Sequence, residues 1–176
     1  MSYIFTSNRL GFRHWIDSDK EPFFNMNSDE DVMRYFPKKL TKPESDGFVK
    51  RITTHFDIHG FGLYAVDLLE SNEFIGFIGF QEANFDAHFT PCIEIGWRLR
   101  KEYWNNGLAT EGAQRCLDYA KQELKFEQIY SFTASTNIAS ESVMKKIGLV
   151  KAGEFNHPKI PTGHPLCRHV LYIKQL

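Results

Sequence analysis

The segment from residue 97 to residue 111 has the residue types and spacing best suited to holding a ligand. A strand pattern ends at Leu99, the loop Asn105-Asn106-Gly107 follows, and a helical pattern begins at Leu108. The first N–H groups of a helix have no partners within it, and the helix dipole favours negative charge there. Gly107 lets a ligand approach the backbone closely. The pattern indicates a pyrophosphate site, with a plain strand-to-helix turn as the alternative.

The strand before this loop has two different faces. Between Cys92 and Leu99, apolar residues alternate with Glu94, Gly96 and Arg98. Because side chains alternate along a strand, one face enters the core and the other presents a carboxylate and a glycine. The pattern alone leaves Glu94 open as a chemical group or as a solvated or salt-bridged carboxylate.

The rest of the sequence predicts the elements that position these two segments. Apolar residues spaced three and four apart predict a helix over residues 108–124, packed on a sheet. Local start and stop signals and alternating runs predict the other elements. The other expected helices span residues 17–26, 43–59 and 137–147, and the expected strands span residues 9–15, 61–69, 73–81, 92–99, 128–134, 149–155 and 168–174. No linker divides them, so residues 1–176 are expected to form one domain.

Composition excludes several classes of protein. The chain has 42% apolar and 24% charged residues, and its 21 basic and 22 acidic residues give a formal net charge of -1. This balance predicts neither a nucleic-acid nor a membrane partner. Three widely spaced cysteines and an N-terminus without a signal pattern predict a cytoplasmic protein. The glycine patterns of dinucleotide-binding folds and P-loop nucleotidases are absent.

Histidines near the C-terminus raise the question of a metal site. His157, His164 and His169 lie near Cys167 in the sequence, but their spacing matches no compact zinc pattern. We therefore predict no metal. The imidazoles are expected either to bond to the backbone or to line a substrate cleft.

Two motifs resemble those of the GNAT family of N-acetyltransferases. Trp104-Asn105-Asn106-Gly107-Leu108-Ala109 is similar to the family's acetyl-CoA pattern, Gln/Arg-x-x-Gly-x-Gly/Ala, with Trp104 in the first place. Residues 103–111 are similar to the Tyr-Trp-x-x-Gly-x-Ala-Thr-Glu of the branch that acetylates ribosomal-protein N-termini at serine or alanine. Residues 137–140 and 146–149 are similar to the second family pattern, Asn-x-x-Ser and Lys-x-Gly-Phe, with Leu149 in place of Phe. The resemblance spans nearly the whole chain.

The resemblance implies a mixed α/β fold with a mostly antiparallel central sheet and helices on both faces. The sheet would be splayed where the strand at 92–99 meets the strand at 128–134. Acetyl-CoA would be the co-substrate, with its pantetheine arm in this split. The residues that the resemblance assigns to the coenzyme are Trp97, Arg98, Leu99, Trp104, Asn105, Asn106, Gly107, Leu108, Ala109, Thr110 and Asn137.

The implied reaction is transfer of an acetyl group to a primary amine by direct attack in a ternary complex. At neutral pH an α-amine costs about 1–2 kcal/mol to deprotonate, against about 4–5 kcal/mol for a lysine. A protein N-terminus is therefore the first choice of acceptor, and a small amine or amino-sugar the second. Glu94 is the expected base, and Ser140 matches a serine that contacts the coenzyme sulfur. Met144 stands where many members have the tyrosine that protonates this sulfur.

Other interpretations remain open for these residues. The Ser140 hydroxyl has the alternative of bonding to the backbone at a helix start, and Asn137 is suited both to cap that helix and to bind a coenzyme amide. The oxyanion of the transition state is expected at the backbone N–H of Trp97 or Arg98. A non-catalytic acyl-CoA-binding or sensor protein is the rival function, and both a monomer and a homodimer are compatible with the sequence.

Overall fold

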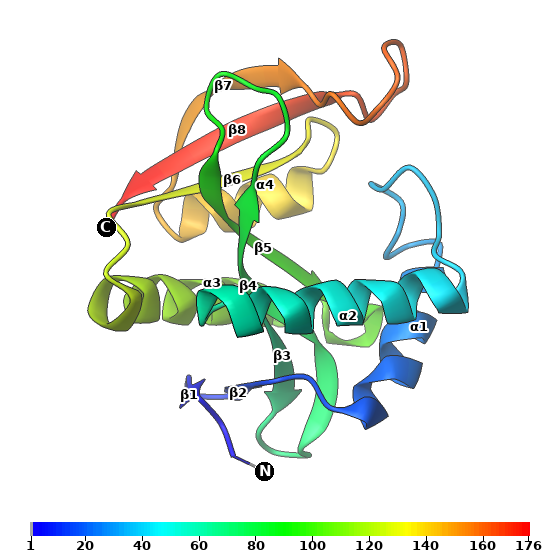
Figure 1. Cartoon of the computed structure of the whole chain (residues 1–176), viewed down its shortest axis with the longest axis vertical. Helices are drawn as coiled ribbons and strands as arrows, with labels where there is room; N and C mark the ends of the chain where they lie inside the picture. The colour runs from blue at the N-terminus through cyan, green and yellow to red at the C-terminus, as the bar shows by residue number, and fades with distance from the viewer. Residues whose placement is uncertain (1) are drawn as a thin grey trace.

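The computed structural model of the protein describes residues 2–176, and its centre is one eight-stranded sheet (Figure 1). The strands lie in the order β1-β2-β3-β4-β5-β6-β8-β7, and every neighbouring pair is antiparallel except β5 and β6, which are parallel. The strands are β1 (Phe5–Thr6), β2 (Leu10–Arg13), β3 (Leu63–Leu68), β4 (Glu73–Ala83), β5 (Cys92–Leu99), β6 (Gln128–Ala134), β7 (Val150–Asn156) and β8 (Arg168–Gln175). The expected mixed α/β fold with a mostly antiparallel sheet is confirmed.

Helices cover both faces of this sheet. They are α1 (Lys20–Ser28), α2 (Lys42–His59), α3 (Leu108–Tyr119), which continues into a π-helical turn (Ala120–Leu124), and α4 (Ile138–Lys146). Phe77 of β4 packs on Phe23 of α1 and Phe48 of α2. Its neighbour Ile78 instead contacts α3 at Gly112. Because adjacent strand residues point to opposite faces, α1 and α2 lie on one face and α3 on the other.

Helix α2 begins and ends where its sequence predicts. The carboxylate of Glu44 accepts a hydrogen bond from the Thr41 N–H at 2.8 Å, and Pro43 lies in the first turn. Gly60 follows the last turn with a φ of 73°, a left-handed conformation that favours glycine. These two local signals fix an 18-residue helix across one face of the sheet (Figure 1).

The N-terminal part of the sheet differs from the prediction. The strand expected at residues 9–15 covers only Leu10–Arg13, and the two-residue strand β1 was not predicted. The chain leaves the sheet after Arg13, whose side chain donates to the carbonyl of His14 at 3.1 Å. A short 3-10 turn at Asp17–Asp19 then leads into α1.

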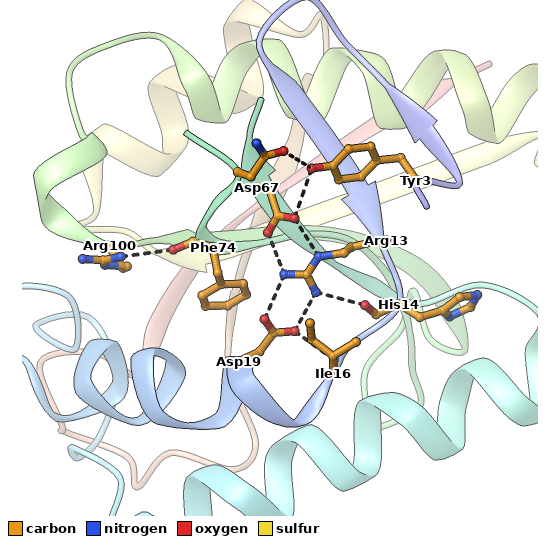
Figure 2. A network of polar contacts seen from close by, with 9 residues as sticks. Tyr3, Arg13, His14, Ile16, Asp19, Asp67, Phe74 and Arg100 are labelled. Atoms are coloured by element: carbon orange, nitrogen blue, oxygen red, sulfur yellow. Dashed lines mark hydrogen bonds and ion pairs between the residues drawn. The ribbon is translucent and has the colours of Figure 1, made fainter. Parts of the chain in front are cut away.

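A buried ion cluster holds this turn in place (Figure 2). Arg13 donates from Nε and Nη2 to the two carboxylate oxygens of Asp67, at 2.7 and 2.6 Å. Its Nη1 and Nη2 donate to the two oxygens of Asp19, at 2.7 and 2.9 Å. Asp19 also accepts from the backbone N–H of Ile16 at 2.9 Å. All three charged side chains are buried, so one guanidinium ties β2, β3 and the start of α1 together.

Candidate active site

The candidate site begins where β5 and β6 separate. One residue pair, Glu94 with Tyr130, joins these parallel strands. Beside it, the Ser131 hydroxyl donates to the carbonyl of Ile95 at 3.0 Å. Because the strands run parallel, their C-terminal ends lie on the same side, and the starts of α3 and α4 therefore flank the split. This arrangement agrees with the splayed sheet expected from the sequence.

The edge of β5 beyond this pair exposes backbone groups. The Ile95 carbonyl faces β6, and backbone groups two residues apart on a strand point to the same side. The N–H and C=O of Trp97 and the N–H of Leu99 therefore face the split. The Leu99 carbonyl accepts from Trp104 Nε1 at 2.8 Å. By the same alternation the backbone of Arg98 faces β4, where its partner is Phe77, so the split is lined by the main chain of alternate residues.

The loop after β5 has the backbone shape of an anion site. Gly107 has a φ of 76° and Asn105 a φ of 61°. Gly107 directly precedes α3 and has no side chain with which to cap it, so the first N–H groups of the helix point to solvent. A Cβ at residue 107 would meet only Arg9 Nη2, at 3.8 Å. Glycine is therefore favoured there by the backbone conformation and by the approach of a ligand, and not by crowding within the protein.

Arg9, which sequence reasoning missed, reaches this loop from the segment before β2. Its Nη1 donates to the carbonyl of Asn106 at 3.1 Å, and its Nε donates to Glu111 at 2.7 Å. The Ser7 hydroxyl donates to the other carboxylate oxygen of Glu111, also at 2.7 Å. Burial would raise the pKa of Glu111, but these hydrogen bonds outweigh it and the pKa is lowered. The acid in the first turn of α3 is thus held away from an incoming anion by contacts that no local pattern reveals.

Glu94 lies on the same face of the sheet as Phe77, the face covered by α1 and α2. Its partner on β4 is Gln81, whose Nε2 donates to the Glu94 carboxylate at 2.8 Å. Burial raises the pKa of Glu94 to about 7, against the opposing effect of this hydrogen bond. Next on the same face is Gly96, where a Cβ would meet no atom within 4 Å. A carboxyl group that titrates near neutrality therefore borders open space, as a general base requires.

Arg98 lies beyond Gly96 on this face, in a setting that the sequence did not predict. Its guanidinium carbon lies 3.9 Å from the ring centre of Phe36, 5.5 Å from that of Phe77 and 5.8 Å from that of Phe48. Nη1 donates to Asn27 Oδ1 at 2.6 Å. Burial lowers the pKa of Arg98 to about 9, so the side chain remains a cation at neutral pH.

The start of α4 holds the second motif found in the sequence. Asn137 caps the helix, because its Oδ1 accepts from the N–H of Ser140 at 3.2 Å, and its Nδ2 donates to the Thr133 hydroxyl at 3.0 Å. The predicted capping role is confirmed, and Ser140 lies half-buried in the first turn. Met144 is fully buried in the core. It contributes packing and has no proton to donate to a sulfur atom.

The C-terminal histidines bond to the backbone, one of the two expected arrangements. His157 Nδ1 accepts from the N–H of Lys159 at 3.2 Å, and His164 accepts from a backbone N–H at 3.1 Å. His169 Nδ1 lies 3.2 Å from the carbonyl of Cys167. Burial, with the charges of His169 and Lys159, lowers the pKa of His157 to about 4. Within residues 2–176 no group of three or more His, Cys, Asp or Glu side chains is placed to hold a metal ion.

An open hollow of about 810 Å³ lies elsewhere, between the start of α1 and α2. Its lining residues are Trp15, Ile16, Asp17, Lys20, Asp46, Gly47, Val49, Lys50 and Thr53. Asp17 and Lys20 pair with each other at 2.7 Å. None of the lining residues comes from β5 or from the loop after it, so we centre the site on β5.

Comparison with protein families decides the assignment. Residues 9–150 match the family model described as the acetyltransferase (GNAT) domain. The chain belongs to the GNAT family. A GNAT relative, the uncharacterized N-acetyltransferase YnaD of Bacillus subtilis, is 32% identical over 160 residues, which cover 90% of this chain and 89% of YnaD. A GNAT acetyltransferase crystal structure from Bacillus anthracis superimposes with a TM-score of 0.80 at 30% identity, covering 97% of this chain and 96% of the other.

More distant GNAT structures share the fold. RimL, a ribosomal alpha-N-protein acetyltransferase in complex with coenzyme A, has a TM-score of 0.79 at 15% identity and covers 99% of this chain and 98% of its own. A spermidine N-acetyltransferase from Vibrio cholerae, in complex with coenzyme A and spermine, has a TM-score of 0.76 at 19% identity and covers 95% of each chain. Their names give one a protein and the other a polyamine as acceptor, so the GNAT fold by itself does not determine the acceptor.

Membership of the GNAT family makes the protein an acetyl-CoA-dependent N-acetyltransferase. The chain offers what such a co-substrate needs: an open backbone edge on β5 and a glycine loop at the start of α3. In the part of the chain described, residues 2–176, no helix combines the length and apolar character of a membrane span.

Proposed function

We propose that the protein acetylates a primary amine by direct attack on acetyl-CoA in a ternary complex. A protein N-terminus is the first choice of acceptor, and a small amine or amino-sugar is the second. The observation that carries this proposal is Glu94, a carboxyl group with a pKa of about 7 beside the open space at Gly96. It lies on the strand whose Trp97 backbone faces the split between β5 and β6.

The backbone of this region supports the placing of the coenzyme. The outward C=O of Trp97 and the N–H of Leu99 would pair with the amides of the pantetheine arm, as an added strand does. The N–H groups of residues 105–110 would hold the pyrophosphate. Asn137, at the start of α4 on the other side of the split, would bind a coenzyme amide with the capacity of its side chain left by capping.

Glu94 would accept the proton of the amine, directly or through a water molecule, as the nitrogen attacks the thioester carbonyl. A nitrogen–carbon bond forms and the carbon–sulfur bond breaks. The N–H of Trp97 would donate to the oxyanion of the transition state, since it faces the split while the Arg98 backbone faces β4. Coenzyme A leaves as a thiolate that accepts a hydrogen bond from the Ser140 hydroxyl. The proton held by Glu94 then passes through water to this sulfur, which restores the carboxylate.

The pKa of Glu94 also bears on the choice of amine. An α-ammonium group, with a pKa of about 8, is only about one unit more basic than this carboxylate, whereas a lysine is more than about three units more basic. Each unit costs about 1.4 kcal/mol in proton transfer. Glu94 is therefore matched to an N-terminal or similarly weak amine, which supports the first choice of acceptor.

The decisive experiment is a thiol-release assay with acetyl-CoA over N-terminal peptides, amino-sugars and polyamines. We expect release with α-amines, and we expect Glu94→Gln to lower kcat/KM about 100-fold or more near pH 7, with a smaller loss at high pH, where the free amine is abundant. Glu70→Gln, an exposed carboxylate in the turn between β3 and β4, serves as the matched control.

Two outcomes would contradict this function. A loss in Glu94→Gln that is uniform across pH would assign Glu94 to positioning and not to proton transfer. If no amine releases thiol above the hydrolysis background, while coenzyme A still raises the melting temperature, the protein is an acyl-CoA-binding or sensor protein.

A further inference from the structure

The side chain of Arg98 is a half-buried cation without a counter-charge. Within residues 2–176, its one hydrogen bond is the 2.6 Å contact from Nη1 to Asn27, and no carboxylate lies within 4.0 Å of its nitrogens. Nε is buried and has no hydrogen-bond partner. A buried donor without a partner is costly, and more so when it is charged, so this arrangement calls for a ligand or another explanation.

The loop between α1 and α2 (residues 29–41), which covers Arg98, does not supply the missing charge. Phe36 stacks on the guanidinium from this loop. The acidic side chains of the same loop are all engaged by other bases: Asp29 with Lys101 at 2.6 Å, Glu30 with Lys39 at 2.9 Å, and Asp31 with Arg34 at 2.5 Å. No acidic side chain of this loop is therefore left to balance the charge of Arg98.

The orientation of Arg98 is fixed by the helix above it. Asn27 of α1 is fully buried, and its Nδ2 donates to the Ser45 hydroxyl of α2 at 2.9 Å. This bond turns Asn27 Oδ1 toward Arg98, which holds Nη1 in place. Among the described residues, Nη2 is left without a partner, and Nε beside it is buried. In Arg13 the corresponding Nη2 donates to carboxylate oxygens of Asp67 and Asp19, at 2.6 and 2.9 Å.

We propose that Arg98 binds a carboxylate of the acceptor, so that the enzyme selects primary amines that carry a carboxylate close to the amino group. A carboxylate suits the free Nη2, because a charge-assisted hydrogen bond to one of its oxygens would also supply the counter-charge that Arg98 lacks. The three aromatic rings around Arg98 reduce its contact with water, which would strengthen this pairing. The carboxylate has two possible sources, a free amino acid or an acidic side chain next to a peptide N-terminus.

The placement of Arg98 relative to Glu94 fits this acceptor. The two residues share one face of β5 and lie about 13 Å apart along the strand, and only Gly96, with open space above it, separates them on that face. An acceptor with its amine near Glu94 would extend across Gly96 to place its carboxylate at Arg98. This inference rests on the proposed function, with Glu94 as the base.

The test compares matched acceptors that differ only in the carboxylate. One arm uses phenylalanine against phenylalaninamide, and a second uses amidated tripeptides with aspartate or asparagine in second position. Spermidine is the cationic counter-probe. By thiol release, we expect wild-type kcat/KM to be about 10- to 100-fold higher for the carboxylate in at least one arm, and that arm identifies the source of the carboxylate.

Variants of Arg98 assign the preference to its side chain. Arg98→Gln should reduce the carboxylate-to-amide ratio of kcat/KM to near one, mainly through KM, since an amide retains a donor for Asn27 but has no charge. Arg98→Lys should restore part of the ratio, because it returns the charge without the planar fork. Arg34→Gln, on the covering loop and exposed, should leave the ratio unchanged.

A binding measurement on the wild type keeps the test independent of variant folding and of turnover. Calorimetry on the protein saturated with coenzyme A measures the affinity for the acetylated products. N-acetylphenylalanine, or the N-acetylated acidic peptide, should bind about tenfold or more tightly than its amide. Equal turnover and equal binding of the matched probes, or a preference for spermidine, would overturn the inference while leaving the proposed function intact. Failure of every amine to release thiol would instead overturn the proposed function.

Discussion

Two guanidinium groups lie near α1, Arg13 buried and Arg98 half-buried, and their surroundings are opposite. Arg13 has four hydrogen bonds to two carboxylates, whereas Arg98 has one amide oxygen and three aromatic rings. Burial would lower the pKa of Arg13, but Asp19 and Asp67 outweigh it and the pKa is raised. At Arg98 nothing opposes burial, and the pKa falls to about 9.

The difference distinguishes a cation whose charge is balanced by carboxylates of the protein from a cation that has no such carboxylate. Removing one member of a closed ion cluster leaves its partners buried and unpaired, so the cluster is sensitive to mutation. A half-buried cation without a carboxylate partner adds little to stability, and recognition of a ligand explains its presence better. We therefore expect mutations at Arg13 to affect folding and mutations at Arg98 to affect acceptor selection.

The largest expected effect is at the closed cluster. Arg13→Met would leave Asp19 and Asp67 buried without a counter-charge and should lower the free energy of unfolding by about 3–5 kcal/mol. Urea unfolding followed by circular dichroism measures this change. Arg34→Met, which breaks an exposed pair, should lower it by about 1 kcal/mol or less. A loss below about 1 kcal/mol in Arg13→Met would show that the cluster does not hold the fold.

The loop at residues 105–107, like Arg98, is expected to be suited to a bound ligand and not to contacts within the protein. Gly107→Glu should weaken coenzyme A binding about 100-fold in calorimetry, because a carboxylate would occupy the pyrophosphate site. Gly163→Glu is the matched control, since its φ of 89° is also left-handed and a Cβ there meets nothing within 4 Å. Both variants should lose about 1–2 kcal/mol of stability to backbone strain. Equal coenzyme affinity in the two variants would move the pyrophosphate away from this loop.

Glu94, like Arg98, is an ionisable group whose charged form is disfavoured by burial, so its effect on stability depends on pH. Its folded pKa of about 7 lies above an unfolded value of about 4.3, so the native state binds the proton more tightly. Wild-type stability attributable to Glu94 is present below pH of about 4.3 and is lost as the pH rises to about 7. Glu94→Gln removes this loss and should be about 2 kcal/mol more stable than wild type at pH 8, but equal near pH 4.

Unfolding curves of wild type and Glu94→Gln at both pH values test this expectation. Glu70→Gln is exposed and should show no difference between the two pH values. A stability difference for Glu94→Gln that does not change with pH would mean that Glu94 is not a desolvated carboxyl group.

The smallest expected change in stability is at Arg98, and it gives the most direct contrast with Arg13. Arg98→Gln should leave the free energy of unfolding within about 1 kcal/mol of wild type, because the half-buried charge is removed while Asn27 keeps a donor. Urea unfolding in parallel with Arg13→Met gives the direct contrast. A loss as large as that of Arg13→Met would make Arg98 a structural residue.

Local patterns predicted the central elements of this fold well. The strands at 92–99 and 128–134 have the predicted bounds, because alternation and neighbouring turn signals define them. The same alternation placed Glu94 on the face away from the apolar stripe, and the asparagine cap of α4 followed from its residue type. The roles of Glu94 and Ser140 in catalysis stay predictions.

What the sequence could not give depends on contacts between distant segments. Arg13 meets Asp67 across 54 positions, and Arg9 meets Glu111 across 102. Arg98 was assigned to the coenzyme through its backbone, and its side chain drew no prediction because Asn27 and Phe36 come from elements far along the chain. A two-residue strand such as β1 is too short to leave a periodic signal.

The single residue pair between β5 and β6 is also the junction of the sheet with the fewest paired residues. Strands β1 to β5 form one continuous antiparallel ladder, and β6, β8 and β7 form another. Local unfolding follows seams with few backbone bonds, so the C-terminal ladder is expected to exchange its amide hydrogens as a separate unit. A coenzyme paired with the open edge of β5 would bridge this seam. Slower amide hydrogen exchange in β6 on adding coenzyme A would show that the coenzyme joins the two ladders.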